Sequence, residues 1–547
     1  MSGSTAQTSS SRWAGLVFIS LAVSLIIVDS TIVNVAVPQI VDELSLTSTQ
    51  VQWVQEAYTL VFASLLLAFG SLADRVGRRR MLVIGTVIFT LSSVLAALAP
   101  TGELLIAARV LQGVGGAMML PTTLALINAT FHGRERGLAF AVWGSTIGGM
   151  AALGPLLGGW LTTAYSWRLA FGINIPLGII IAIGVLLTVS ESKDPQARRV
   201  DVIAAILSVI TFASLVFGLI EGRTLGWWRT DKPFTIGTWT WPLDLSPVPI
   251  AFLISAVAAA AFILRGVRRQ KAGESTMLAF DLFRIPSFRN GNLVAMVVSL
   301  GEFGIILALP LWLQFVLGFE AVQTGLILLA LAGGSFAASA LTAPLSGRIA
   351  PLTLVRWGLV AEIVGIVGLA VMIHPDANWV TLLPGLFVYG VGVGLATAQL
   401  TGVVLTDVPV TQSGQGSGTQ STARQVGSAL GIAILGTILF SVTGGMLAAD
   451  LSDKGVPSDQ AKQVVSAVVD SAGAAIPGLR GSPATQPLAA AAAEAFSTGT
   501  RLAAFSAAAF LAVGLLATGS LRTRRPQVSA GDGIDARPAV EGVPATE

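Results

Sequence analysis

Long apolar runs constrain this chain more than any other feature of its sequence. A helix that crosses a bilayer needs roughly 20 mainly apolar residues, and fourteen segments of the 547-residue chain meet that need. Only helices and closed barrels satisfy their backbone groups in lipid, and these runs do not alternate as barrel strands do. The sequence therefore predicts an all-α polytopic membrane protein. The predicted spans are 14–37, 51–73, 80–99, 103–129, 136–163, 168–190, 200–221, 247–268, 290–316, 322–346, 352–373, 379–407, 415–443 and 500–521.

The composition excludes several other classes of protein. Charged residues make up 11% of the chain and hydrophobic residues 53%, whereas a soluble domain carries roughly 25% charge. A soluble enzyme, a disordered protein and a coiled coil are thereby excluded. The chain has no cysteine and only two histidines, which argues against thiolate or histidine metal sites. We expect no metal, no cofactor, no nucleic-acid partner and no catalytic activity, and no phosphate-binding loop of a hydrolytic pump is present.

Arginine and lysine predict the orientation of the chain. If the N-terminus is cytoplasmic, most of these residues fall in short inner loops, as the positive-inside rule requires. The densest group is Arg75, Arg78, Arg79 and Arg80. An even number of spans then places both termini in the cytoplasm, and we expect a multi-pass protein of the inner (cytoplasmic) membrane.

An internal repeat predicts two halves of similar build. Residues 70–77 match residues 343–350 at an offset of 273, and Gly113-Val-Gly115 matches Gly390-Val-Gly392 at an offset of 277. Parallel halves of this kind are one plan of membrane transporters, with the substrate site at their interface. Two extra spans lie between the six-span halves.

The charged residues of the first half are not expected to be repeated in the second, since Asp74 aligns with Gly347 and Arg109 with Leu386. We therefore expect the first half to hold chemistry that the second half lacks. The predicted parts are a cytoplasmic tail 1–13, an N-terminal six-helix bundle 14–190, two inserted helices with linking loops 191–289, a C-terminal six-helix bundle 290–521 that includes a long extracytoplasmic loop 444–499, and a disordered cytoplasmic tail 522–547.

Ionisable residues inside spans are functional candidates by default, and we select five: Asp29, Glu56, Arg109, Glu302 and Glu362. Asp29, Glu56 and Arg109 can share one level of the first half. Burial favours the protonated form of an acid and a nearby arginine favours its charged form, so an acid under both influences can load and release a proton. We expect Asp29 to carry the proton, Arg109 to tune it, and Glu56 to bind a second proton or the substrate. The alternatives are a fixed Asp29–Arg109 salt bridge and an exposed rim position for Glu56.

The other two acids, Glu302 and Glu362, are candidates for binding a cationic substrate or a second proton, the alternative being a polar packing role. We also expect Arg424 to pair with Asp407 at the cytoplasmic rim. Aromatic and amide residues near the acids suit a large apolar cavity with a few polar anchors. The predicted substrate-binding residues are Asn34, Tyr58, Gln112, Glu302, Trp312, Gln314 and Glu362.

One motif resembles a known family. Residues 70–80, Gly-Ser-Leu-Ala-Asp-Arg-Val-Gly-Arg-Arg-Arg, resemble motif A of the major facilitator superfamily and lie between the second and third spans, as that motif does. Asp74 at this place can pair with an arginine or cap a helix N-terminus. The resemblance implies a gating latch formed by Gly70, Asp74, Arg75, Gly77, Arg78 and Arg79.

Further segments resemble the same superfamily. Residues 105–121 resemble motif B, and residues 29–38 resemble the first-span motif of fourteen-span drug:proton antiporters. Residues 53–58, 167–178 and 310–318 are similar to the same family. Small residues spaced by three or four allow close helix packing, and those of the fifth span resemble motif C, the antiporter signature: Gly144, Gly148, Gly154, Pro155, Gly158 and Gly159.

The resemblance implies the major facilitator fold, with two six-helix bundles and two extra central helices. It also implies a monomer that exports amphipathic or hydrophobic, possibly cationic, drugs across the bilayer in exchange for protons, by alternating access. One alternative is a dedicated exporter of one endogenous metabolite or lipid on the same fold. Another, of a different class, is a proton-coupled importer or a membrane sensor that does not transport.

Overall fold

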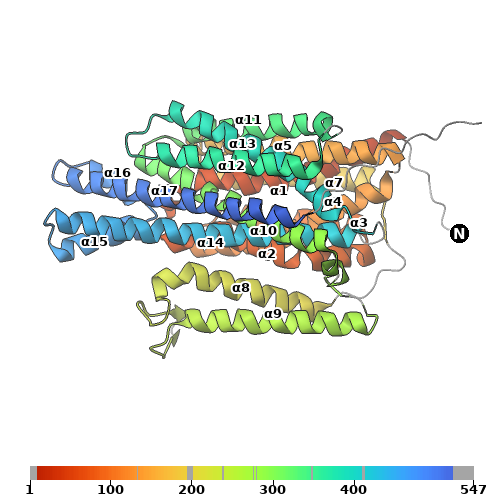
Figure 1. Cartoon of the computed structure of the whole chain (residues 1–547), viewed down its shortest axis with the longest axis horizontal. Coiled ribbons are helices and arrows are strands. Elements are labelled where there is room, and N and C mark those ends of the chain that lie inside the picture. The colour runs from red at the N-terminus through yellow and green to blue at the C-terminus, as the bar shows by residue number, and fades with distance from the viewer. Residues whose placement is uncertain are drawn as a thin grey trace, which may run out of the picture.

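Long helices run side by side along most of the molecule (Figure 1). The computed structural model describes residues 9–131, 133–193, 201–236, 239–274, 276–278, 280–346, 349–409 and 413–521. The first half consists of α1 (Ser9–Leu44), α2 (Ser48–Val76), α3 (Arg78–Ala97), α4 (Gly102–Thr130), α5 (Gly133–Ala164), α6 (Arg168–Gly172) and α7 (Asn174–Thr188). The inserted part consists of α8 (Val202–Leu225), the hairpin of β1 (Thr235–Ile236) and β2 (Trp239–Thr240), α9 (Pro247–Lys271) and the 3₁₀ turn η1 (Phe280–Arg284). The second half consists of α10 (Pro286–Leu311), the π-helical turn η2 (Trp312–Val316), α11 (Ala321–Ser346), α12 (Pro351–Met372), α13 (Trp379–Leu405), α14 (Ser413–Asp453), α15 (Ser458–Asp470), α16 (Ala475–Arg480), α17 (Gln486–Ala517) and the 3₁₀ turn η4 (Thr518–Ser520).

The prediction of an all-α polytopic membrane protein is confirmed. Among the described residues, twelve helices are long and apolar enough to cross a membrane, and the bent helix α2 makes a thirteenth. Helix α5 coincides with the remaining predicted span, 136–163, and many of its side chains lie outside the described ones. The count of fourteen spans therefore stays a prediction, as do the two predicted tails, of which 1–8 and 522–547 are outside the described residues.

The bundle has two distinct ends (Figure 1). We call the end that carries α15, α16 and the turn between α1 and α2 the cap end. We call the opposite end, where Arg78–Arg80 open α3, the basic end. At the cap end Thr47 starts α2 with a capping box, in which its hydroxyl accepts from the Gln50 amide at 3.2 Å and its own amide donates to Gln50 Oε1 at 3.0 Å. This cap lets the chain reverse direction within a few residues.

The two halves meet along two helix pairs, and small residues make both contacts close. Along α5 and α11, a Cβ placed on Gly159 would lie 2.5 Å from the Ala321 carbonyl oxygen, and one placed on Gly325 would lie 2.5 Å from the Pro155 carbonyl oxygen. Each glycine therefore faces the backbone of the other helix, as small residues do where helices pack in lipid. These contacts lie in the part of the bundle nearer the cap end.

The second pair is α2 with α14, and we call their contact the seam. Leu60 of α2 forms a hydrophobic cluster with Ala429 and Ala433 of α14. One turn further toward the cap end, Gly436 leaves room for the Gln52 amide group. The seam is therefore closed from the middle of the bundle toward the cap end.

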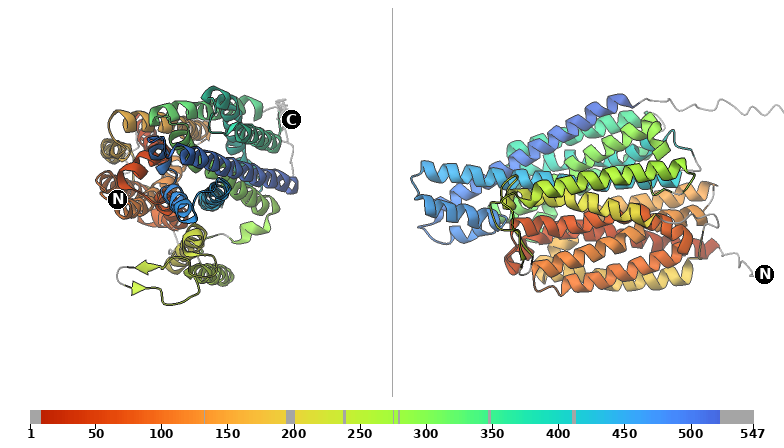
Figure 2. Two further views of the ribbon diagram at one scale, coloured as in Figure 1. Left: turned by 90° about the vertical axis from the view of Figure 1, so that its left-hand side faces the viewer. Right: turned by 90° about the horizontal axis from the view of Figure 1, so that it is seen from below.

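The inserted helices lie beside the bundle rather than within it (Figure 2). Helix α8 packs over the seam, because the Leu60 cluster also includes Val216 and Ile220. Side chains tie α8 to α2 in particular. Trp53 Nε1 donates to Glu221 Oε1 at 3.0 Å, and the hydroxyls of Thr49 and Thr224 are 3.0 Å apart. Helix α8 is also hydrogen-bonded to α14, because the Thr437 hydroxyl of α14 donates to the Leu219 carbonyl oxygen of α8 at 3.1 Å.

The segment 444–499 contains more helix than the partly ordered loop predicted for it, in which one helical stretch is expected near 457–470, where α15 lies. Helix α14 continues to Asp453, α17 begins at Gln486, and α15 and α16 lie between them, so most of the segment is helical. The alanine-rich run 489–493 has the highest helix propensity available, and buried Ala461, Val464 and Val468 form an apolar stripe on α15. These helices form a cap on the second half (Figure 1).

Candidate functional site

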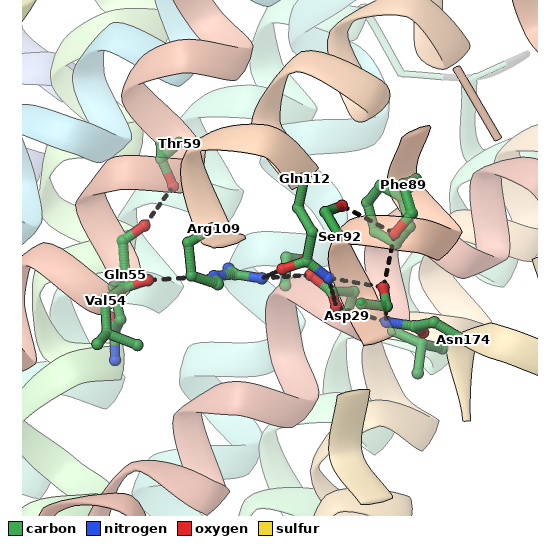
Figure 3. Close-up of polar contacts among 12 residues, drawn as sticks. Asp29, Val54, Gln55, Thr59, Phe89, Ser92, Arg109, Gln112 and Asn174 are labelled. Carbon is green, nitrogen blue, oxygen red and sulfur yellow. Dashed lines mark hydrogen bonds and ion pairs between the residues drawn. The ribbon is translucent and has the colours of Figure 1, made fainter. Parts of the chain in front are cut away.

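Asp29 lies at the centre of a buried polar network in the first half (Figure 3). Its side chain is 0% exposed. Oδ2 accepts from Arg109 Nη1 at 2.5 Å, while Oδ1 accepts from Gln112 Nε2 at 3.1 Å and from Asn174 Nδ2 at 2.7 Å. Helices α1, α4 and α7 thus converge on one carboxyl. Three donors suit the ionised carboxylate, which only accepts hydrogen bonds.

Ser93 of α3 completes the network. Its hydroxyl oxygen accepts from Gln112 Nε2 at 2.8 Å and from Asn174 Nδ2 at 3.2 Å, and its hydroxyl donates to the Phe89 carbonyl at 2.8 Å. Neither Ser93 nor Asn174 is among the predicted site residues, although Asn174 lies in a segment that resembles the antiporter family. Neutral polar residues are common in spans, so only their convergence on Asp29 distinguishes them.

Arg109 has partners besides Asp29. Its Nε donates to the Val54 carbonyl oxygen at 3.1 Å, and Nη1 also donates to Gln112 Oε1 at 2.9 Å. The centre of its guanidinium lies 4.4 Å from the centroid of the Tyr58 ring, the distance of a cation–π contact. Arg109 therefore has three protein partners besides the Asp29 carboxylate.

Glu56 is buried but lies apart from this network. Its side chain is 0% exposed, which excludes the alternative of an exposed rim position. Neither of its oxygens has a hydrogen-bond partner among the described residues. Residues 52, 56 and 60 share one face of α2 by helical spacing, and Gln52 and Leu60 both contact α14. Glu56 therefore lies on the face of α2 that forms the seam.

A second polar group lies in the other half. Arg424 Nη2 is 3.8 Å from Glu302 Oε2, so the predicted pairing of Arg424 with Asp407 is wrong. Asp407 instead accepts from the Ser287 hydroxyl at 2.8 Å. Arg424 lies on α14 and Asp407 lies in the turn after α13. The rotation of α14 about its axis places the Arg424 guanidinium toward Glu302 of α10.

Glu362 of α12 belongs to the same group. It is 0% exposed, and both of its oxygens lack a hydrogen-bond partner among the described residues. A Cβ on Gly392 of α13 would lie 2.5 Å from Glu362 Cγ, so the acid packs against the backbone of α13. The Tyr389 hydroxyl, one turn away on α13, donates to the Glu302 carbonyl oxygen at 2.9 Å.

The remaining predicted substrate residues are dispersed. Asn34 donates to the Ser30 carbonyl oxygen of its own helix at 3.3 Å. Trp312 Nε1 donates to Ser497 Oγ at 2.9 Å, and Gln314 Nε2 donates to the Val35 carbonyl oxygen at 3.2 Å. Both last residues are buried in the π-helical turn that follows α10 near the cap end. The structure therefore brings Tyr58 and Gln112 to the Asp29 network, but not Asn34, Trp312 or Gln314.

The motif A-like loop folds onto its own half. Asp74 pairs with Arg78 at 2.8 Å within the loop. Gly77 has φ +128°, a conformation open to glycine, and a Cβ there would lie 2.7 Å from the Glu191 carboxyl group. Glu191 accepts from the backbone amides of Arg79 and Arg80 at 3.0 and 3.2 Å. Gly70 makes an ordinary contact with Pro121, and Arg75 is exposed.

The motif C-like glycines bring α5 close to two neighbours. Gly154 faces Thr31 of α1, and a Cβ on Gly158 would lie 2.8 Å from the Ile32 carbonyl oxygen. Gly159 and Pro155 instead meet α11, as described above. Gly144 and Gly148 lie within α5 but outside the residues whose surroundings the structure describes. The motif therefore packs α5 against α1 in its own half and against α11 across the interface.

Comparison with known families gives this architecture a name. The sequence model of the Major Facilitator Superfamily matches residues 19–432, which include the Asp29 network and the acids of the second half. The chain belongs to the major facilitator superfamily. The prediction of that family and of its fold is confirmed. It is therefore a membrane protein of the transporter type.

Curated members of the superfamily share much of this sequence. The chain is 33% identical over 449 residues to the "Probable actinorhodin transporter" of Streptomyces coelicolor, covering 81% of this chain and 75% of the relative. It is 34% identical to the multidrug efflux pump LfrA of Mycolicibacterium smegmatis, covering 80% and 82%. It is also 34% identical to the puromycin resistance protein pur8 of Streptomyces alboniger, covering 80% and 84%.

A solved structure shares the major facilitator fold. It is a crystal structure of a bacterial homologue of the human lysosomal transporter Spinster, with a TM-score of 0.63 and 16% sequence identity. The match covers 94% of this chain and 98% of that chain. At this identity the likeness concerns the fold alone.

Proposed function

We propose that the protein exports amphipathic or hydrophobic compounds, cationic ones included, from the cytoplasm in exchange for protons. Asp29 carries the coupling proton and Arg109 tunes its affinity. The relatives named above include a multidrug efflux pump and a drug resistance protein, which supports export of such compounds. The observation that carries the proposal is the buried Asp29–Arg109 pair with its neutral hydrogen-bond donors.

The surroundings of Asp29 favour a switch over a fixed salt bridge. In a fixed pair, loss of the carboxylate charge would leave a buried guanidinium without a partner, which is strongly unfavourable. Here the Val54 carbonyl, Gln112 Oε1 and the Tyr58 ring remain in contact with Arg109 when Asp29 takes up a proton. Asp29 can therefore alternate between its charged and neutral forms at modest cost.

The contacts between the halves support an inward-facing state. With the predicted orientation the cap end faces outward, and the close contacts of α5 with α11 and of α2 with α14 lie toward that end. The ionised Asp29 then corresponds to the state after the proton has left toward the cytoplasm. A substrate entering from the basic end drives the opposite opening, in which Asp29 takes up a proton from outside and the substrate leaves.

An asparagine at position 29 tests this function. Purified protein in liposomes would be given tetraphenylphosphonium as a cationic probe together with an imposed pH gradient. Asp29→Asn keeps the size of the side chain but cannot bind a proton, so we expect accumulation driven by the gradient to fall to the level of protein-free liposomes. Counterflow of the probe without a gradient should continue. The matched control is Asp450→Asn, whose acid is partly exposed and pairs with Lys454 at 2.6 Å.

The same liposomes separate the alternatives. Full accumulation by Asp29→Asn would overturn the role of Asp29. Transport of the probe without competition from unrelated cations, or no transport of any member of a panel, would favour a dedicated exporter of one compound. Accumulation in the direction of the proton flux would favour an importer, and absence of counterflow would favour a sensor.

A further inference from the structure

One acid of the second half occupies the position related to Asp29 by the internal repeat. Glu302 lies 273 residues after Asp29, the offset that relates the two motif A-like stretches. Tyr389 lies 277 residues after Gln112, the offset of the Gly-Val-Gly repeat. In the folded protein Gln112 Nε2 donates to the Asp29 carboxylate, and the Tyr389 hydroxyl, on the fourth helix of its half, donates to the backbone carbonyl oxygen of Glu302. The expectation that no charge is repeated is thus wrong at this position.

Glu362 also has a counterpart in the first half. Gly85 faces the Gly115 carbonyl and Phe89 packs beside it, while Gly358 faces the Gly392 carbonyl and Glu362 packs beside it. Glu362 therefore occupies the place of Phe89. The second half replaces a buried ring by a buried carboxyl, and its first, third and fourth helices all contribute to the group, as they do in the first half.

The charges of this group do not balance. Arg424 Nη2 lies 3.8 Å from Glu302 Oε2, and among the described residues Glu362 has neither an ion pair nor a hydrogen bond, so Arg424 compensates the charge of one of the two acids. Among the described residues, the charged side chains on the other helices of this half are engaged elsewhere. Arg356 of α12 is bound to Thr518 at the basic end, at 3.0 Å, and Arg501 of α17 lies 3.9 Å from Glu494 toward the cap end. Two ionised acids would leave an uncompensated negative charge in a dry interior, and one bound proton removes it.

We propose that Glu302, Glu362 and Arg424 form a second proton-binding site in the second half, with Glu362 as the residue that carries the proton. The proposal rests on the proposed function. Glu362 has two oxygens free of hydrogen bonds among the described residues, and it is too deeply buried for a drug-sized cation to touch. A proton moves between water and one Glu362 oxygen, and no other bond forms or breaks.

Arg424 connects this site to the conformational cycle. It lies on α14, the helix whose Ala429, Ala433 and Gly436 form the seam with α2. Its side chain is 25% exposed and its bond to Glu302, at 3.8 Å, is long for an ion pair. Movement of α14 when the seam opens therefore changes the distance from Arg424 to the two acids. A closer Arg424 favours release of the proton from Glu362, and a more distant one favours its uptake.

The experiment counts protons. Tetraphenylphosphonium would be added to the purified full-length protein in weakly buffered detergent solution with a pH-sensitive dye, and the protons released per bound cation would be measured. Glu362→Gln keeps the shape of the side chain, and we expect it to release one proton fewer than the wild type. The matched control, Glu494→Gln, changes a mostly exposed acid on α17 and should release the wild-type number.

A transport assay gives a second measurement. In liposomes, the loss of one coupling proton reduces the response of tetraphenylphosphonium transport to membrane potential, because fewer charges move per cycle. The proposal would be overturned if folded Glu362→Gln released the wild-type number of protons and kept the wild-type response to membrane potential. Loss of counterflow in this variant would also overturn it, because Glu362 would then be a substrate contact. If the variant does not fold, release of only one proton per cation by the wild type overturns it. Absence of any transport by the wild type would instead contradict the proposed function.

Discussion

At the scale of single residues, the buried acids fall into two kinds. Asp29 accepts three hydrogen bonds, one of them from an arginine, and is stabilised as a carboxylate. Glu56 and Glu362 have no such partners among the described residues. An isolated charge in a span is costly, and a buried acid without partners therefore favours its neutral form. The first kind suits the step after a proton has been released, and the second kind suits the step in which a proton is held.

Glu56 offers a test at this scale. It lies on the seam face of α2, so it meets water from the cap end only when α2 and α14 separate. We expect Glu56→Gln to make the rate of tetraphenylphosphonium transport several-fold less sensitive to the pH on the cap side, because the proton that enters there has lost an acceptor. Initial rates measured over a range of that pH would check this. An unchanged pH profile would contradict it.

The control for Glu56 is another acid of the same end. Glu103 of α4 is exposed and accepts from Gln50 Nε2 at 2.7 Å. Its carboxyl group is already in contact with solvent while the seam is closed. Glu103→Gln should therefore keep the wild-type pH profile.

At the scale of elements, the contact of α5 with α11 is one of the two that close the cap end. An added Cβ on Gly159 would lie 2.5 Å from the Ala321 carbonyl oxygen, so the helices must separate to accept it. Overpacking of this kind costs about 1–3 kcal/mol, and only the state in which these helices touch bears the cost. We expect Gly159→Ala to shift the population toward the state that is open at the cap end.

Spin labels would measure that shift. The chain has no cysteine, so labels on cysteines placed at Tyr165 and Val380, both exposed near the cap end, report one distance without background. The distance between labels should lengthen in Gly159→Ala. Gly333→Ala is the matched control on α11, where a Cβ meets nothing within 4 Å. Equal distance distributions in the two variants would refute the role of this contact.

At the scale of the whole molecule, we expect the two halves to move relative to each other and the inserted helices to move with the first half. Thr163 Oγ1 accepts from the Val322 amide at 3.0 Å across the two halves. Thr49 and Thr224 join α2 to α8 within what we expect to be one moving part. A disulfide in place of the first pair should stop transport until it is reduced. A disulfide in place of the second pair should leave transport near the wild-type rate.

Transport by the two double-cysteine proteins, before and after reduction, checks this expectation. Inhibition by the bridge from α2 to α8 would show that the inserted helices move relative to the first half. Undiminished transport by the bridged Thr163→Cys/Val322→Cys protein would show that the cap end does not open there. Either result would change the assignment of moving parts.

The sequence alone determined the class of protein and most of its helices. Hydropathy is a local property that adds up along the chain, so the apolar runs predicted where most long helices lie. The predicted bounds were wrong where a helix extends beyond its apolar run, since α14 continues to Asp453 and α17 begins at Gln486. The motif residues indicated the superfamily because their spacing is also a local property of the sequence and does not depend on the fold. The sequence also confined the candidate acids to a short set, since so few charges fall inside the spans.

Only the tertiary structure decided which of those acids have partners. Asn174 and Ser93 join Asp29, Arg424 turns to Glu302 rather than to Asp407, and Glu56 lies apart. These outcomes depend on how each helix is rotated and how far it is shifted along its neighbours. Rotation and shift are set by close packing between segments hundreds of residues apart, and hydropathy along one segment carries no record of them.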